Sequence, residues 1–285
     1  MTSSQPARRP AFNWRNLGIR AASAAILGTA AAAAIWAGGW PYFLMVSIAA
    51  CVLSVEWGGM STPATPIRTS VAVAVVVVAS LFVAELESPR YGMVALAGLT
   101  AVATLLLRSV TRHIWDVPFG AAYLGIPAIA LLWLRTGEEG LAWTVLLFAV
   151  TWSADIAAFA VGNAVKGPKL RPAFSPNKTW SGFFGGLAAA TLAGGIAQAA
   201  LAGLDNPGMH LPVSTGSAML IGFLGGFATM AGDLWESWLK RRFGVKDSSD
   251  LIPGHGGLLD RVDGLLFAAA AVAAARWLWQ SGALG

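Results

Sequence analysis

The densest group of side chains able to bind phosphates or a metal ion lies in residues 233–263. Six of the 14 acidic residues fall here, with six basic residues when His255 is counted, around a Pro-Gly-His-Gly-Gly turn. The rest of the chain is mostly apolar. Because charge is unfavourable next to hydrocarbon, a group this dense indicates a functional site.

Three acids in this stretch predict a metal site. Asp260 and Asp263 are three residues apart, so they share one face of a helix's first turn, and Asp233 lies about 9 Å inside the preceding helix. Together they could form an oxygen cage for Mg²⁺, which uses one or two carboxylates with phosphate oxygens and water. Two alternatives stay open: acids that only stabilise a helix N-terminus, and an ion pair of Asp233 or Glu236 with Lys240 that joins helices.

The loop before Asp260 predicts a phosphate site. Gly256 and Gly257 allow backbone angles that other residues resist, so several N–H groups can face one anion. His255 could donate to a phosphate oxygen or accept a proton, although a loop histidine is often only solvated. Positive charge beside the loop comes from Lys240, Arg241 and Lys246.

A second polar cluster occupies residues 151–186. Asp155 is expected at the same depth in its helix as Asp233, so the two acids could share a hydrated site. A polar segment then opens the next helix, where an N-cap can bind phosphate. Its candidate residues are Ser175, Asn177, Lys178 and Thr179. The alternative is a basic loop facing lipid headgroups, and Gly182, Gly185 and Gly186 indicate close helix packing.

Composition sets the elements that must position these residues. The chain is 56% hydrophobic and only 12% charged, about half the charged share of a typical soluble domain, which indicates a multi-span membrane protein. Apolar runs of about 17–25 residues predict helices rather than barrel strands. We therefore expect an all-α fold in the lipid bilayer with nine spans: residues 17–38, 41–57, 67–85, 91–108, 117–134, 141–165, 179–204, 213–239 and 261–281.

The distribution of basic residues predicts the orientation. With the N-terminus in the cytosol, 16 of the 19 Lys and Arg residues fall on the cytosolic side and three outside, a strong positive-inside bias. Both charged clusters then face the cytosol. We expect the protein to lie in the inner (cytoplasmic) membrane of the cell. Residues 1–16 are interpreted as a disordered tail and residues 17–285 as one transmembrane domain, with the active-site half at about residues 141–285.

The motif of residues 237–263 resembles the signature of the phosphatidate cytidylyltransferases, also called CDP-diacylglycerol synthases. The matching positions are Ser237, Lys240, Arg241, Lys246, Asp247, Pro253, His255, Gly256, Gly257, Asp260, Arg261 and Asp263. Residues 155–182 also resemble this family, whereas the first half shows only generic spans. Ser249 departs from the pattern, where glycine is commoner, but a small residue still fits.

The resemblance implies that CTP and phosphatidic acid react to CDP-diacylglycerol and pyrophosphate, with Mg²⁺ as cofactor and room for a second cation. It implies metal ligands at Asp233, Asp260 and Asp263, with Asp155 and Asp247 as further candidates, and catalytic roles for Lys240 and His255. Substrate contacts are implied for Ser175, Asn177, Lys178, Thr179, Ser237, Arg241, Lys246, Gly256, Gly257 and Arg261. No nucleic-acid partner is expected. The sequence does not determine the oligomeric state, and a homodimer is compatible with it.

Two other functions are alternatives for this sequence. A CTP-dependent polyprenol or phytol kinase has related chemistry, but it needs a base for a hydroxyl acceptor, and the Asp-Arg-x-Asp motif argues against it. A cation-coupled transporter would place polar residues near the middle of the membrane on paired broken helices. Here the charges stay near the cytosolic side, and the sequence has no convincing internal repeat.

Overall fold

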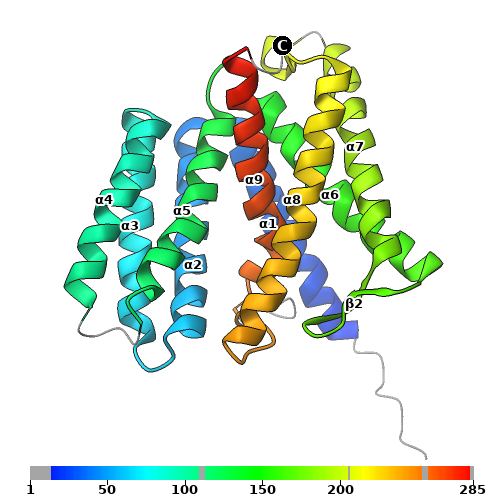
Figure 1. The fold of residues 1–285 in the computed structure, drawn as a ribbon. Helices are drawn as coiled ribbons and strands as arrows, with labels where there is room; N and C mark the ends of the chain where they lie inside the picture. Colours follow the sequence, from blue (N-terminus) through cyan, green and yellow to red (C-terminus); the bar gives the residue numbers. More distant parts are fainter. Residues whose placement is uncertain (1–13, 109–112, 205, 252–255, 283–285) are drawn as a thin grey trace, which may run out of the picture.

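The computed structural model describes residues 14–108, 113–204, 206–251 and 256–282 (Figure 1). Within these residues the chain forms nine α-helices, one short 3₁₀ helix and a two-stranded hairpin. The helices are α1 (Trp14–Ala37), α2 (Gly39–Ser61), α3 (Pro66–Leu86), α4 (Pro89–Leu107), α5 (Asp116–Arg135), α6 (Gly140–Val165), α7 (Trp180–Ala202), α8 (Thr215–Arg242) and α9 (Leu259–Gln280). The 3₁₀ helix is η1 (Pro207–Met209), and the strands are β1 (Lys169–Arg171) and β2 (Ser175–Thr179).

The predicted polytopic helical fold is confirmed. Eight helices, α2 to α9, are long and apolar enough to cross a membrane within the described chain. Large apolar side chains such as Val75 and Leu106 are exposed on the outside of the bundle, where a bilayer would cover them. For α1 the apolar segment is Gly28–Ala37, and a full crossing by this helix stays a prediction. Helix α1 also begins at Trp14, inside the predicted tail.

Successive helices run in alternating directions, which collects the polar clusters at one end of the bundle. Helices α2, α6 and α8 end where α3, α5, α7 and α9 begin, beside the hairpin (Figure 1). We call this the β2 end. The two polar stretches, separated by about fifty residues of sequence, therefore lie on the same side of the molecule.

Two apolar cores hold the helices together. One packs α2, α3 and α5 around Trp57, Leu81 and Leu124. The other packs α6 to α9 around Trp143 and Val272, and helices α5 and α9 contribute to both cores. A single bundle results, with α8 and α9 between the first-half helices and the α6–α7 pair (Figure 1).

The α6–α7 contact confirms the expected close packing through glycine. A Cβ atom on Gly182 would lie 2.6 Å from the carbonyl oxygen of Ala158, and one on Gly186 would lie 2.8 Å from that of Ala154. Only hydrogen fits at these positions, so the two helix backbones approach closely. This contact fixes the start of α7 against the end of α6.

The hairpin corrects part of the prediction for residues 175–179. Ser175 to Thr179 form strand β2, which pairs antiparallel with β1 so that Lys169 lies opposite Thr179. Prolines in this connection disfavour helix, so the chain extends until Thr179. Thr179 is the N-cap of α7 as predicted, since its Oγ1 accepts the N–H of Gly182 at 3.1 Å.

Candidate active site at the β2 end

A cavity of about 470 Å³ opens at the β2 end between α6, α8, α9 and the hairpin. It brings together both polar clusters that the sequence analysis singled out. Its polar lining consists of Asp155, Asn163, Asn177, Lys178, Thr179, Asp233, Asp260, Arg261 and Asp263. Two cationic side chains thus share one space with four carboxylates.

Carboxylates crowd the centre of this cavity. The Lys178 ammonium of β2 pairs with Asp233 of α8, with about a third of each side chain exposed. Asp263 of α9 lines the same cavity as Asp233. Asp155 of α6 lines this cavity as well. Lys178 and Arg261 therefore share this cavity with Asp155, Asp233 and Asp263, which leaves an excess of negative charge.

Asp260 takes part in a different arrangement, centred on Lys240. The Lys240 ammonium lies 2.6 Å from Asp260 Oδ1 and 2.8 Å from Glu236 Oε2, and its side chain is only 14% exposed. Asp260 Oδ2 accepts hydrogen bonds from the Ser248 N–H at 3.0 Å, the Ser248 hydroxyl at 2.9 Å and the Gly257 N–H at 3.1 Å. Both oxygens of Asp260 are thus satisfied within the protein.

A carboxylate from the first half of the chain completes this arrangement. Glu56 of α2 is 2% exposed, and its Oε1 accepts the Ser249 hydroxyl at 2.6 Å and the Leu258 N–H at 2.7 Å. Its Oε2 accepts the Leu259 N–H at 2.7 Å. These two N–H groups belong to the open N-terminus of α9, where a negative charge is favourable. Glu56 therefore caps the helix that carries Asp260 and Asp263.

Close packing explains a glycine in this loop. A Cβ atom on Gly257 would overlap the Ser248 hydroxyl and lie 2.8 Å from Glu56 Oε1. Any side chain there would push the loop away from both carboxylates. The motif thus requires glycine at this position for packing, besides any phosphate contact by its backbone.

Sequence comparison with known proteins agrees with the kind of site that this geometry indicates. The sequence profile of the cytidylyltransferase family matches residues 18–279. A phosphatidate cytidylyltransferase of Brucella suis biovar 1 (strain 1330) is 41% identical over 259 residues, which are 90% of this chain and 91% of the relative. One of Staphylococcus aureus (strain COL) is 37% identical over 146 residues, about half of either chain.

The chain belongs to the cytidylyltransferase family. The family match starts at residue 18, so it includes the first-half helices, in which the motifs alone showed nothing specific. The position of Glu56 agrees with a match that includes the first half. This buried residue of the first half is hydrogen-bonded to the start of α9, which carries part of the motif in the second half.

Several motif residues of this cytidylyltransferase lie outside the cavity lining. Ser175 is buried in β2, and Ser237 is half-buried on α8. Arg241 is exposed and donates to the Val245 carbonyl at 3.4 Å. Lys246 and Asp247 are exposed on the α8–α9 connection. Residues 252–255, including His255, lie outside the described residues, and Gly256 has a φ of 81°, which favours glycine.

The side chains of Asp233, Asp260 and Asp263 do not converge on one point in the described residues, and metal binding by these acids stays a prediction. In the described part of the chain no three His, Cys, Asp or Glu side chains converge as ligands of one ion. Asp260 turns toward Lys240 and Ser248 instead, and Lys240 also pairs with Glu236, as the ion-pair alternative predicted for Glu236. Asp233 and Asp263 remain, and two adjacent carboxylates in a cavity with space for phosphates suit the coordination of Mg²⁺.

Two residues that hold Asp260 or the start of α9 in place, Glu56 and Ser248, were not predicted from the sequence. Glu56 gave one available signal, because it is the only acid in the apolar run of residues 41–57, and an ionisable residue within a span is by default a functional candidate. Ser248 gave none, since a serine in a polar loop is unremarkable. Its role depends on the fold, which directs its N–H and hydroxyl at Asp260.

Proposed function

We propose that the protein transfers the cytidylyl group of CTP to phosphatidic acid, giving CDP-diacylglycerol and pyrophosphate. The observation that carries the proposal is the cavity at the β2 end, where Lys178 and Arg261 share one space with Asp155, Asp233 and Asp263. Cations suit the phosphates of both substrates, and the carboxylates suit a dication. The names of the relatives support phosphatidic acid as the acceptor.

In this reaction a phosphate oxygen of phosphatidic acid forms a bond to the α-phosphorus of CTP. The bond from that phosphorus to the oxygen bridging to the β-phosphorus breaks, and pyrophosphate leaves. The attacking phosphate is already ionised, so no side chain has to activate it by removing a proton. The protein must therefore hold the two phosphates in line and balance their charge.

We assign a role in the reaction to each residue from its position in the site. Lys178 on β2 and Arg261 on α9 flank the cavity and would hold phosphate oxygens, with Asn177 and Thr179 beside them. Arg241 and Lys246 are exposed at the same end and add positive charge for the triphosphate. Lys240 is occupied by Glu236 and Asp260, so we assign it to positioning rather than to direct phosphate binding. His255 remains a candidate for orienting a phosphate.

Asp233 and Asp263 would hold Mg²⁺, with Asp155 close enough to bind a metal-bound water or a second cation. A bound dication would neutralise charge that develops on the transferred and leaving phosphates. The two carboxylates come from the adjacent helices α8 and α9, so the cap that Glu56 places on α9 also sets the separation of these ligands.

The active site is proposed to face the cytosol from the inner membrane. The β2 end carries most of the Lys and Arg residues outside the apolar spans, as the positive-inside rule requires of a cytosolic face. CTP is then available directly from solution, and phosphatidic acid from the adjoining leaflet.

The test is product analysis with purified protein in detergent. With CTP, phosphatidic acid and Mg²⁺ we expect pyrophosphate and CDP-diacylglycerol, and no pyrophosphate when phosphatidic acid is omitted. A CTP-dependent lipid kinase would release CDP and phosphorylate a polyprenol instead. Release of CDP, or no turnover of CTP by a folded protein with all three components, would refute the proposal.

A further inference from the structure

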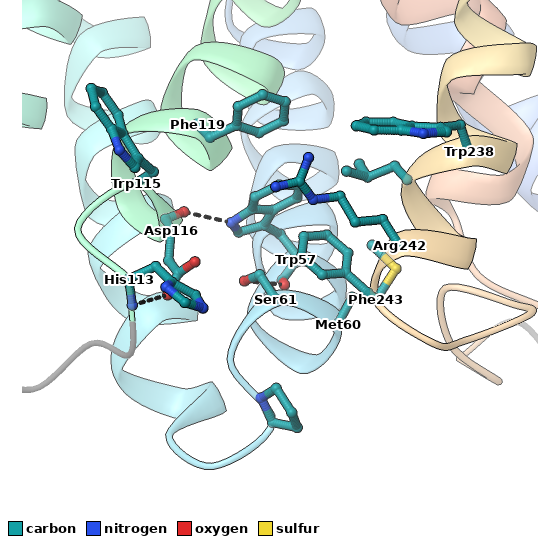
Figure 2. A pocket seen from close by; sticks show the side chains of 12 residues that line it. Trp57, Met60, Ser61, His113, Trp115, Asp116, Phe119, Trp238, Arg242 and Phe243 are labelled. Carbon is teal, nitrogen blue, oxygen red and sulfur yellow. Dashed lines mark hydrogen bonds between the residues drawn. The ribbon is translucent and has the colours of Figure 1, made fainter.

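A second cavity, of about 570 Å³, lies at the β2 end on the other side of α8 (Figure 2). It is bounded by the end of α2, the start of α5 and the end of α8. Figure 2 shows Trp115 and Phe119 on the α5 side and Trp238 on the α8 side, with the Arg242 side chain extending from α8 toward Trp57. None of the acids of the candidate active site lines this cavity.

The cavity presents one positive charge that no ion pair within the described chain neutralises. The Arg242 guanidinium lies over the Trp238 ring at 5.4 Å from its centroid, and no ion pair of Arg242 is found among the described residues. The carboxylate in the lining, Asp116, is 7% exposed and accepts the His113 N–H at 3.1 Å at the start of α5. A planar guanidinium stacked on an aromatic ring is well suited to bidentate phosphate binding.

The walls are apolar and continue onto the outer surface. Trp115 is 73% exposed and Phe119 37% exposed, both at the start of α5, which is long and apolar enough to span a membrane. Trp57 is fixed at the base by donating its Nε1–H to the Asp116 carbonyl at 2.9 Å, and its ring stacks on Phe119. Exposed tryptophans at helix ends are typical of the interface between hydrocarbon and headgroups. The cavity thus combines an apolar wall, at the depth of the membrane–water interface, with one cationic side chain, Arg242.

We propose that this cavity binds an anionic phospholipid of the surrounding bilayer, with its phosphate on Arg242 and an acyl chain along Trp115 and Phe119. The lipid is a resident ligand and not the reacting molecule, because Asp155, Asp233 and Asp263 line the other cavity across α8. A nucleotide could also stack on the aromatic rings, but the large exposed area of Trp115 favours a lipid. The inference does not rest on cytidylyl transfer.

Thermal unfolding of the full-length protein in neutral detergent tests this site, with phosphatidylglycerol as the probe and phosphatidylcholine as the neutral-headgroup reference. A ligand that binds the folded state raises the Tm, by roughly 5 °C at a hundredfold excess over its Kd. We expect phosphatidylglycerol to raise the Tm of the wild type well beyond phosphatidylcholine. Arg242→Gln should lose most of that difference, and Trp115→Ala should lose part of it.

The matched control is Arg68→Gln, which removes the same charge from an exposed position at the β2 end but outside the cavity. It should keep the wild-type response. Arg242 and Trp115 are both exposed, so both variants should fold, as their Tm without lipid will show. Equal responses of Arg242→Gln and Arg68→Gln would overturn the site. A rise produced by CTP instead, and lost in Arg242→Gln, would show a nucleotide site and also overturn it.

Discussion

The carboxylate of Glu56 on α2 accepts the backbone N–H of Leu259 on α9 at 2.7 Å, across 203 residues of sequence. With the Leu258 N–H on its other oxygen, Glu56 replaces the side-chain cap that α9 lacks locally. A buried carboxylate is stable only when its oxygens are hydrogen-bonded, which the two N–H groups and the Ser249 hydroxyl achieve here. The first half of the chain thus fixes the position of the motif helix.

Glu56→Ala should therefore lower both stability and turnover. It leaves two N–H groups of α9 without their partner, and we expect a loss of about 2–4 kcal/mol in unfolding free energy. Glu56→Gln keeps one acceptor oxygen and the side-chain shape, so it should recover part of kcat. A positioning role predicts that kcat falls more than KM for CTP rises, because Glu56 does not line the active-site cavity.

The control for this change is Glu87→Gln, at an exposed position at the other end of the bundle. It should match the wild type in Tm and in steady-state kinetics. Glu56→Ala enzyme with wild-type kcat, measured at a temperature where it is fully folded, would rule out a role in positioning α9.

The helical membrane fold was predictable because it follows from local composition. Apolar runs of sufficient length must form helices in lipid, and the predicted spans agree with the eight helices α2 to α9 to within a few residues. The hairpin was not predictable in the same way. The conformation of residues 175–179 depends on pairing with Lys169 and Arg171 across a turn.

Most residues that line the site could be predicted from the sequence, but the contacts among them could not. Spacing placed Asp260 and Asp263 on one helical turn, and depth placed Asp155 near Asp233, and all four line one cavity. Whether Asp260 faces a metal or Lys240 depends on side-chain direction and on a loop that closes over it. Those contacts are made by residues outside that helical turn: Ser248 lies 12 residues before Asp260, and Glu56 lies on α2, so spacing alone could not decide them.

The different contacts of Asp260 and Asp263 predict different Mg²⁺ dependences. Asp263→Asn removes a proposed ligand, so the Mg²⁺ concentration for half-maximal activity should rise roughly tenfold or more. Asp260→Asn breaks the partly buried pair with Lys240, so it should lower the Tm and kcat while leaving the Mg²⁺ requirement of the remaining activity close to wild type. Titration of activity with Mg²⁺ at fixed CTP distinguishes the two.

Asp250→Asn is the control, because Asp250 is exposed on the α8–α9 connection and lines neither cavity. It should behave as the wild type in both measurements. If Asp260→Asn shifts the Mg²⁺ requirement as far as Asp263→Asn does, Asp260 binds the metal in the working enzyme and the three-carboxylate cage forms on substrate binding.

Lys178 should act on substrate binding more than on folding. Its ion pair with Asp233 is partly exposed, so Lys178→Gln should change the Tm little. Loss of a charged hydrogen bond to a phosphate should raise KM for CTP or phosphatidic acid roughly tenfold. Lys169→Gln, on the neighbouring strand and exposed, is the matched control and should keep both KM values. Identical kinetics of the two variants would show that Lys178 only neutralises Asp233.

The orientation of the β2 end can be tested by labelling single cysteines in cells. Cys51 is replaced by Ala, and cysteine is introduced at Asp250, which is exposed at the β2 end, or at Glu138, which is exposed on the α5–α6 connection at the opposite end. Ser248 would be a poor choice because it is buried and bonded to Glu56 and Asp260. The positive-inside bias predicts that a membrane-impermeant thiol reagent labels Glu138→Cys in intact cells and Asp250→Cys only after permeabilisation. Both variants should retain activity, which verifies that each protein is folded in the membrane. Labelling of Asp250→Cys from outside intact cells would place the active site away from cytosolic CTP and would contradict both the orientation and the proposed route of the substrate.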